Sequence, residues 1–324
     1  MKACGICNNT AGNRVHIARE MMFGFRDQFE YLECGQCGCL QLLLPPKDLS
    51  RYYPRDYYSF QAHGRLMTFL RHRWSAFAYG KPSPIGWLIS VIYFPNRALA
   101  AFRRLNPPKQ ARILDVGCGS GHLLLDLQHL GFDRLAGLDP FVERQLDYEG
   151  GLTVYRKQLD EFDGQFDIIM LHHAYEHMDN PLGVMNALSR LLKPGGSVIL
   201  RIPVASSYGW KHYGVNWVNL DAPRHLFLHT TSSISHLAKQ ANLSIRQIIQ
   251  EVDDSVFWAS EAYAQDIPMS DPRFPFNSMR KRLVGLRQRG KYLAKAKELC
   301  ELNQSDGVCF YLGKPVPQPP QANL

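Results

Sequence analysis

The 324-residue sequence predicts an α/β protein built on a mostly parallel sheet, and two observations lead to this fold class. From residue 111 onward, short apolar runs alternate with segments of helical periodicity, an order typical of parallel sheets with helical crossovers. The first of these runs ends in an acid and then in three glycines at alternate positions, within ARILDVGCGSGHL (111–123). Because ligands of such sheets bind at the carboxyl ends of the strands, this turn is the expected ligand site.

The strands are predicted from apolar runs between breaking residues. The run FDIIML (166–171) is continuously apolar, as in a strand buried on both faces. The expected strands cover residues 111–116, 134–138, 153–156, 166–171, 197–202, 245–252 and 308–312.

The helices are predicted from periodicity and from their end signals. Leucines at helical spacing mark 122–130, Lys193-Pro194-Gly195-Gly196 closes 181–192, and Thr231 or Ser232 is the expected cap of the next helix. The expected helices cover residues 65–79, 95–105, 122–130, 181–192 and 231–241.

Composition divides the chain into a cysteine-bearing module, an aromatic and arginine-rich connecting segment, and the α/β region. We expect these at 1–43, 44–106 and 107–314, with a helical insertion at 253–304 and a disordered tail at 315–324. The longest apolar run, GWLISVIYF (86–94), is too short to cross a membrane, which takes roughly 20 residues. A buried helix is favoured there, and peripheral membrane contact is the alternative.

The chain carries a formal charge of +8, of which residues 278–304 hold +6, from eight Lys or Arg and two Glu. This segment is either a solvated helix face or a surface for phosphates of RNA, of anionic lipid or of a nucleotide-linked substrate. No apolar stretch follows Met1-Lys2, and five of the eight cysteines fall within the first 39 residues. These features predict metal binding in a reducing compartment, and hence a cytoplasmic protein.

The cysteine spacing predicts a structural zinc ribbon. Cys4-x-x-Cys7 and Cys34-x-x-Cys37 would supply four thiolates on two tight turns, with the ribbon strands between them. Cys39 is an alternative or spare ligand, and a set of buried thiols without metal is the competing interpretation.

The glycine turn does not suit a dinucleotide or a phosphate loop. A dinucleotide fingerprint needs a third glycine at position 122, which is His122, and no Gly-Lys-Ser/Thr follows. The sequence DVGCGSG (115–121) instead resembles the first motif of the class I S-adenosylmethionine-dependent methyltransferases. FDIIMLHHAYEHMDNP (166–181) and LKPGGSVILRIP (192–203) resemble further segments of the same family.

The resemblance implies a Rossmann-like seven-stranded methyltransferase sheet and S-adenosyl-L-methionine as the cofactor. By analogy with dinucleotide folds, Asp139 would bind both ribose hydroxyls, and His172 would form a wall of the pocket. The expected cofactor-binding residues in and around the turn are Asp115, Gly117, Gly119, Gly121, Asp139 and His172.

The stretch YLECGQCGCLQLLLPPKDLSRYYPRDYYSF (31–60) resembles bacterial methyltransferases in which a zinc ribbon precedes a Tyr-Pro-x-x-Tyr-Tyr segment, a group related to sugar methyltransferases. The resemblance implies that Tyr57 and Tyr58 fold over the cofactor, and simple aromatic packing is the alternative. The sugar C-methyltransferases usually carry a longer C-terminal domain, which we do not expect in this chain.

Methyl transfer to oxygen or carbon requires a base, and histidine is the natural one at neutral pH. His177 or His225 is the expected base, Arg224 is expected to hold an anionic substrate group, and Trp210 and Trp217 are candidate walls of an acceptor pocket. The remaining candidates lie beside them: His173, Tyr175, Glu176, Asp221 and His229.

The predicted function is methylation of a small-molecule acceptor, a sugar or glycan-linked precursor, at oxygen in preference to carbon. One alternative is an RNA methyltransferase that uses the ribbon and the basic segment 278–304. The fourth strand, however, lacks the Asn/Asp-Pro-Pro-Tyr/Phe signature of many base-amino methylases. The other alternative is a non-catalytic zinc-ribbon binding protein. The presence of all the expected acids and glycines of the cofactor site argues against it: Asp115, Gly117, Gly119, Gly121 and Asp139.

Overall fold

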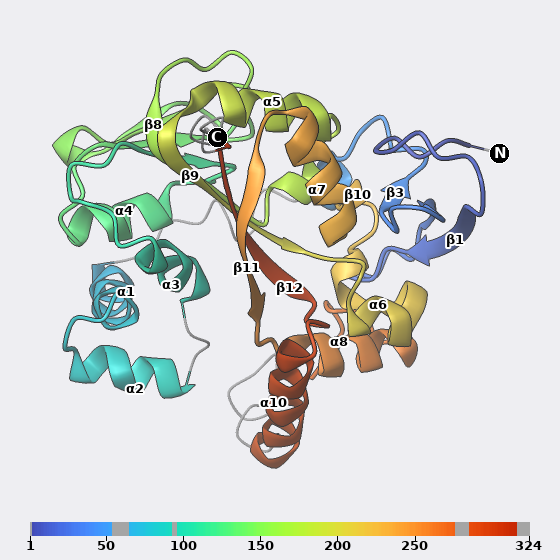
Figure 1. The fold of residues 1–324 in the computed structure, drawn as a ribbon. Coiled ribbons are helices and arrows are strands. Elements are labelled where there is room, and N and C mark those ends of the chain that lie inside the picture. The colour runs from blue at the N-terminus through green and yellow to red at the C-terminus, as the bar shows by residue number, and fades with distance from the viewer. Residues whose placement is uncertain (1, 54–64, 93–95, 276–284, 316–324) are drawn as a thin grey trace, which may run out of the picture.

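A computed structural model of the chain describes residues 2–53, 65–92, 96–275 and 285–315. Its centre is an eight-stranded sheet in the order β11-β12-β9-β8-β4-β5-β7-β6 (Figure 1). The strands are β4 (Ile113–Val116), β5 (Leu135–Leu138), β6 (Leu146–Asp147), β7 (Thr153–Tyr155), β8 (Phe166–His172), β9 (Leu192–Pro203), β11 (Ser244–Glu251) and β12 (Gly307–Gly313).

The middle of the sheet, from β9 through β8, β4 and β5 to β7, is parallel, and β12, β11 and β6 join antiparallel. This arrangement confirms the α/β, Rossmann-like prediction with its seven expected strands. The two-residue β6 was not expected. Strand β9 begins at Leu192, five residues earlier than expected, because the chain leaves α5 directly in extended conformation.

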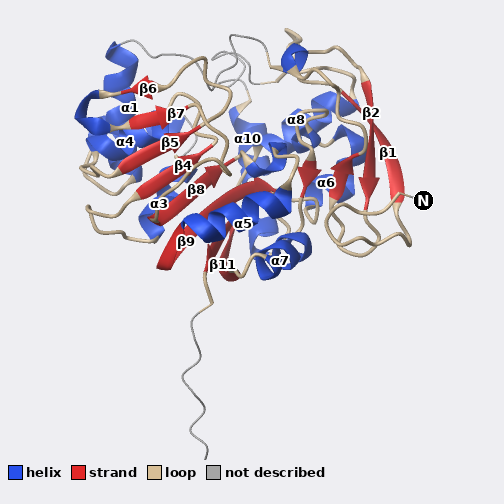
Figure 2. Ribbon diagram, turned by 90° about the horizontal axis from the view of Figure 1, so that it is seen from above, coloured by secondary structure: helices blue, strands red, loops and turns tan. Residues whose placement is uncertain are grey.

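Helices cover both faces of the sheet (Figure 2). On β8, Ile169 and Leu171 join the core with α5 and α7, whereas Ile168 and Met170 join the core with α3 and α4. This alternation follows from the two-residue period of a strand. The helices are α1 (Arg65–Ala78), α2 (Pro84–Ile92), α3 (Arg97–Arg104), α4 (His122–His129), α5 (Pro181–Leu191), α6 (Tyr208–Tyr213), α7 (Thr231–Gln240), α8 (Ser255–Ala264) and α10 (Leu286–Glu301).

Helix starts carry the end signals that capping chemistry requires. Asn180 caps α5 by accepting a hydrogen bond from the Gly183 N–H, and Pro181 follows at the first turn. The cap of α7 is Thr230, one residue before the predicted position, where it forms a capping box with Ser233.

A second, four-stranded sheet joins the N-terminal module to the α/β region. Its order is β1 (Arg14–Arg19), β2 (Gln28–Glu33), β3 (Leu40–Leu42) and β10 (Phe227–Leu228). The last strand comes from a distant part of the chain and pairs antiparallel with β3. The ribbon therefore shares a sheet with the segment that carries His225, and its cysteines belong to the main hydrophobic core.

The apolar run at 86–94 forms a helix over its described part, but the expectation that this helix is buried is wrong. Trp87 and Leu88 are more than half exposed, because α2 packs on α1 rather than within the core. The insertion at 253–304 contains α8 and α10; its residues 276–284, and 316–324 of the tail, lie outside the described residues. None of the helices described is long and apolar enough to span a bilayer.

Candidate functional site

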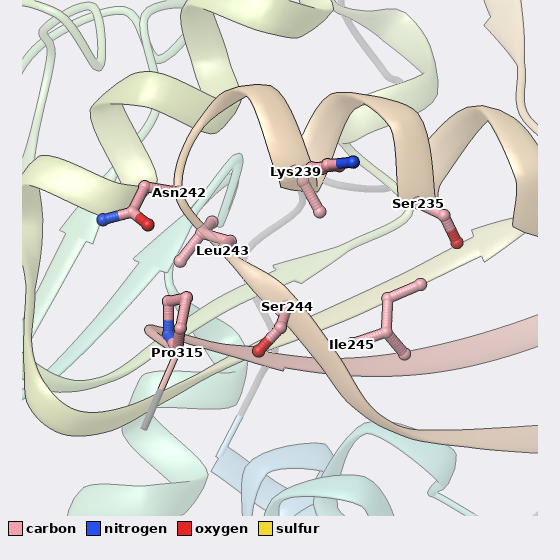
Figure 3. Close-up of a pocket in the computed structure, with 8 residues that line it drawn as sticks. Ser235, Lys239, Asn242, Leu243, Ser244, Ile245 and Pro315 are labelled. Carbon is pink, nitrogen blue, oxygen red and sulfur yellow. The ribbon is translucent and has the colours of Figure 1, made fainter. Parts of the chain in front are cut away.

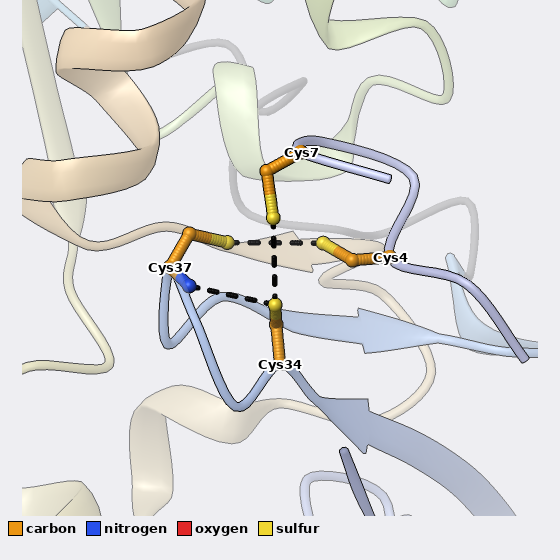
Figure 4. A group of neighbouring side chains, drawn as sticks. All are labelled: Cys4, Cys7, Cys34 and Cys37. Carbon is orange, nitrogen blue, oxygen red and sulfur yellow. Dashed lines mark hydrogen bonds between the residues drawn. The ribbon is translucent and has the colours of Figure 1, made fainter. Parts of the chain in front are cut away.

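Four cysteine sulfurs meet at the tip of the ribbon (Figure 4). The Sγ atoms of Cys4 and Cys37 are 3.7 Å apart, and those of Cys7 and Cys34 are 3.5 Å apart, so neither pair is a disulfide. A tetrahedron with Zn–S bonds of about 2.3 Å has edges of about 3.8 Å, so this spacing fits tetrahedral zinc.

Backbone amides support the cluster as they do at thiolate–metal turns. The N–H groups of Gln36 and Cys37 each lie 3.4 Å from the Cys34 sulfur. Cys39 is buried outside the four-sulfur group, and its sulfur is 4.0 Å from His229 Nδ1. The alternative in which Cys39 serves as a ligand is therefore not favoured by the geometry.

The glycine turn after β4 takes a backbone path that only glycine follows without strain. Gly117, Gly119 and Gly121 have φ values of +73°, +55° and +76°. A Cβ at Gly117 would lie 2.5 Å from the Cβ of Ala174, so a side chain there would collide with the loop after β8. The turn thus lies directly beside the segment that carries Glu176 and His177.

Two buried acids flank this turn. Asp139 accepts hydrogen bonds from the N–H of Gly119 at 2.8 Å and from that of Phe141 at 2.9 Å, and burial raises its pKa. Burial, and then the charge of Asp139, raises the pKa of Asp115 to about 8. A positively charged ligand would stabilise both ionised acids. The residues present therefore fit a ligand with a sulfonium and an ammonium group and a ribose.

His172 ends β8 and is partly buried, and its Nε2 is enclosed without a hydrogen-bond partner among the described residues. Its Nδ1 lies 3.4 Å from Arg201 Nη1, and burial, followed by the charge of Arg201, holds the pKa of His172 well below its ordinary value. It is therefore a neutral side chain at the carboxyl edge of the sheet. Tyr57 and Tyr58 lie outside the described residues.

Glu176, His177 and His225 form the second chemical cluster. Glu176 and His177 belong to the short 3₁₀ helix Tyr175–His177, and His225 comes from the loop before β10. One ligand atom from each of the three lies within 4.8 Å of the others, a geometry that could share a proton or hold a divalent cation. Glu176 is fully buried, and its Oε1 lies 3.4 Å from His173 Nδ1.

Backbone carbonyls orient both imidazoles. His225 Nδ1 is 2.7 Å from the carbonyl oxygen of Asn219, and His177 Nδ1 is 2.8 Å from that of Arg224. Each Nδ1 therefore donates its proton to a carbonyl, which leaves Nε2 as the basic nitrogen when the ring is neutral. His225 Nε2 lies 4.0 Å from Glu176 Oε1.

The charges in this cluster are set by burial and by neighbouring groups. Burial opposes ionisation of Glu176, but the hydrogen-bonding and charge interactions with His173, and then the charges of His177 and His225, lower its pKa to about 2. Burial, followed by the charge of His177, lowers the pKa of His225 to about 4. At neutral pH the cluster thus contains a carboxylate beside a neutral, proton-accepting imidazole.

Arg224 is placed differently from expectation. Its guanidinium is fully buried and forms ion pairs with Asp221 and with Glu20 of the ribbon. The predicted role as an anchor for an anionic substrate group does not agree with this burial, because protein carboxylates already neutralise the charge. Arg224 instead links the ribbon to the loop that carries His225.

The tryptophans are also not exposed to an acceptor. Trp210 and Trp217 belong to a buried cluster between the ribbon sheet and α8, and the Trp210 indole donates to Glu33. His229 is buried and packs on Tyr175.

Two tyrosines were missed by the sequence analysis. Tyr53 O–H lies 3.1 Å from His177 Nδ1, and Tyr31 donates from its hydroxyl to the carbonyl oxygen of His225 at 2.8 Å. Tyr53 begins the Tyr-Pro-x-x-Tyr-Tyr segment, so its place in that motif is a local signal for it. Nothing in the local sequence marks Tyr31, because its partner is 194 residues away.

A cavity of about 480 Å³ lies elsewhere, between the end of α7 and the start of β11 (Figure 3). Ser244 pairs with Gly313 at the end of β12. The neighbouring Leu312 pairs with Val198, which in turn pairs with Ile169 in the first half of β8. The cavity is therefore at the amino-terminal edge of the parallel strands, away from the glycine turn.

Comparison with known proteins identifies the domain around the turn. Residues 91–248 match the family model of a methyltransferase domain. A ubiquinone biosynthesis O-methyltransferase of Pseudomonas aeruginosa (strain UCBPP-PA14) is 31% identical over 157 residues, covering 43% of this chain and 66% of the relative. The corresponding mitochondrial enzyme of Dictyostelium discoideum is 31% identical over 114 residues, covering 29% of this chain and 36% of the relative.

Solved structures are more distant. A chain from a complex that contains the Haloferax volcanii Trm112 methyltransferase activator is 17% identical with a TM-score of 0.47, over 76% of this chain and 96% of that one. The family model, the sheet order and the acid-and-glycine turn agree with one another. Residues 91–248 therefore contain a methyltransferase domain of the class I, S-adenosylmethionine-dependent type.

Proposed function

We propose that the protein transfers the methyl group of S-adenosyl-L-methionine to a hydroxyl oxygen of a small-molecule acceptor, with His225 as the general base. The observation that carries the proposal is the neutral His225 imidazole, whose Nδ1–H is held by the Asn219 carbonyl while Nε2 lies beside ionised Glu176. His177, oriented in the same way by the Arg224 carbonyl, is the other candidate base.

The cofactor, when bound, supplies an electrophilic methyl group on a sulfonium. The glycine turn would approach its amino acid portion, because Gly117, Gly119 and Gly121 leave the backbone uncovered. Asp139 would hold the ribose hydroxyls through the oxygen lone pairs that its two backbone hydrogen bonds leave available. Asp115 would offset the positive charge from beneath the turn.

The base would take the acceptor's hydroxyl proton on Nε2 as the oxygen attacks the methyl carbon in line. Ionised Glu176 would stabilise the imidazolium that results, since opposite charges a few ångströms apart attract. Ala174, two residues before Glu176, lies against Gly117, so the base cluster is close to the cofactor turn in space. This proximity gives the alignment of donor and acceptor that an in-line displacement needs.

The acceptor that we propose first is a sugar or glycan-linked precursor, on the basis of the ribbon-first resemblance. A phenolic hydroxyl on a quinone precursor is a second candidate, because the relatives named above are ubiquinone biosynthesis O-methyltransferases. Both candidates are small-molecule hydroxyls, and both need the same base.

The acceptor is identified by incubating the protein with methyl-labelled S-adenosylmethionine and a fractionated extract of the source cells. Label in nucleotide-sugar or glycan fractions supports the first candidate, and label in phenolic lipids supports the second. Label that is lost on ribonuclease treatment would instead favour an RNA substrate. Absence of transfer to any fraction by a protein that binds the cofactor would contradict the catalytic role.

We also propose that the four cysteines hold a structural zinc ion. The ion would stabilise the ribbon, and through it the catalytic loop, because Thr230 donates its hydroxyl hydrogen to the Cys37 carbonyl and Tyr31 binds the His225 carbonyl. A closed four-sulfur site has no open position for a substrate. Its contribution to catalysis is therefore one of positioning.

Cys34→Ser is expected to lose zinc and to lower Tm by roughly 5 °C or more, since metal binding and folding are coupled in such sites. Metal analysis and thermal unfolding measure the two effects. Cys39→Ser is the matched control, and it should keep full zinc content because its sulfur lies outside the cluster. A wild-type protein purified without zinc, or a Cys34→Ser variant with full zinc, would contradict the assignment.

A further inference from the structure

The pair formed by α1 and α2 lies at the outside of the molecule. Helix α2 packs against α1, and α1 packs against α3 and α4 (Figure 1). The contact with α1 is close at Gly86, where a Cβ would lie 2.2 Å from the carbonyl oxygen of Arg73. The glycine brings the two helix backbones together, and the far side of α2 is left to solvent.

The two helices carry several large apolar side chains that are exposed to water. Leu66 of α1 is 72% exposed, and Trp87 and Leu88 of α2 are 56% and 54% exposed. The two helices hold six of the fifteen exposed large apolar side chains among the described residues. The six are Leu66, Met67, Phe69, Ile85, Trp87 and Leu88. Gathered apolar side chains of this kind mark an interaction surface.

The same part of the chain carries positively charged residues and no negatively charged ones. Residues 57–114 contain nine Lys or Arg and no Asp or Glu. Arg71 and Arg97 reach acids on other elements, Asp126 and Asp253. The exposed Arg73 guanidinium lies over the Phe69 ring at 5.0 Å, so basic and apolar groups are interleaved on α1.

Basic side chains also mark the turn between the two helices. Lys81 is exposed there. The Arg103 guanidinium packs beside Gly80, because a Cβ built on this glycine would lie 2.5 Å from the Arg103 Cζ. In the described part of the chain, neither of these two residues nor Arg73 forms an ion pair with an acid. The turn is therefore a concentration of positive charge at one end of the apolar face.

We propose that the α1–α2 face docks onto an anionic membrane surface. Anionic bilayers bind protein surfaces that combine basic residues with exposed Trp and Leu. The basic groups contact the lipid phosphates, and the apolar side chains insert at the boundary between headgroups and acyl chains. A nine-residue helix is about 14 Å long, which suits lying in the interface and is too short to cross it. A second copy of the chain is a poorer occupant, because two acid-free basic faces repel each other.

The test is sedimentation of the full-length protein with vesicles of phosphatidylcholine, alone or mixed with phosphatidylglycerol. Binding is expected for the mixed vesicles, weakening as salt is raised, and little binding is expected for phosphatidylcholine alone. Trp87→Ser/Leu88→Ser and Arg73→Glu/Lys81→Glu should each weaken binding by about tenfold or more. Both variants change exposed positions and should keep the wild-type Tm and cofactor affinity.

Two matched variants control for apolarity and for charge elsewhere. Val15→Ser/Ile17→Ser removes similarly exposed apolar groups from β1, and Lys291→Glu/Lys297→Glu reverses charge on the basic helix α10. Both should bind the mixed vesicles as wild type does. The proposal is overturned if the protein does not bind anionic vesicles, or if only the α10 variant loses binding. It is also overturned if light scattering shows a dimer that the substitutions Trp87→Ser/Leu88→Ser convert to a monomer.

Discussion

Asp139→Ala is expected to reduce cofactor affinity by roughly 10²- to 10⁴-fold while the protein stays folded. Two charge-assisted hydrogen bonds to ribose hydroxyls contribute about 1.5–3 kcal/mol each, and the substitution removes both acceptors. The fold should survive because burial raises the pKa of Asp139, so its ionised form is already disfavoured in the folded state. Calorimetric titration with S-adenosylhomocysteine measures the affinity, and thermal unfolding checks the fold.

Two further variants make this result specific. Asp139→Asn retains an oxygen acceptor and should show an intermediate loss of affinity. Asp133→Ala removes an exposed acid just before β5 and should bind like wild type. If Asp139→Ala binds with unchanged affinity, the ribose contact proposed for this residue is wrong.

His225→Ala is expected to lower kcat by about 10²- to 10⁴-fold, the usual contribution of a general base. Cofactor affinity should change little, because the proposed contact of this residue is with the acceptor. His236→Ala, at an exposed position on α7, is the matched control and should leave kcat unchanged. Glu176→Gln should also lower kcat, because the imidazolium formed during transfer loses its partner carboxylate.

The pH profile tests which histidine acts. The pKa of His225 is about 4, so its neutral, basic form predominates above that value, and kcat/KM should hold its plateau from neutral pH down to about pH 5. Zinc content and folding must be followed over the same range. An acid limb near the ordinary imidazole value of about 6.5 would contradict the assignment to His225. Assays with and without added Mg²⁺ separate base catalysis from a metal held by the same cluster.

Local patterns in the sequence were enough to predict the sheet, the glycine turn and the cysteine cluster. Each depends on short-range rules: the apolar periodicity of strands and helices, the positive φ that Gly117, Gly119 and Gly121 supply, and the chelating reach of a Cys-x-x-Cys pair. Such patterns can be interpreted without knowing which distant segments meet. The ribose contact of Asp139, which follows β5, was predicted by analogy with dinucleotide folds and stays a prediction.

The surroundings of the proposed base, in contrast, depend on contacts between distant segments. His225 meets Glu176 across 49 positions of sequence, and Arg224 meets Glu20 across 204, so local pattern could not reveal that one imidazole is neutral and one guanidinium is already paired. The same holds for β10, which completes the ribbon sheet, and for α2, whose apolar side chains remain exposed. The burial of a side chain and its ion pairs depend on many contacts with distant segments, and these contacts exist only in the folded chain.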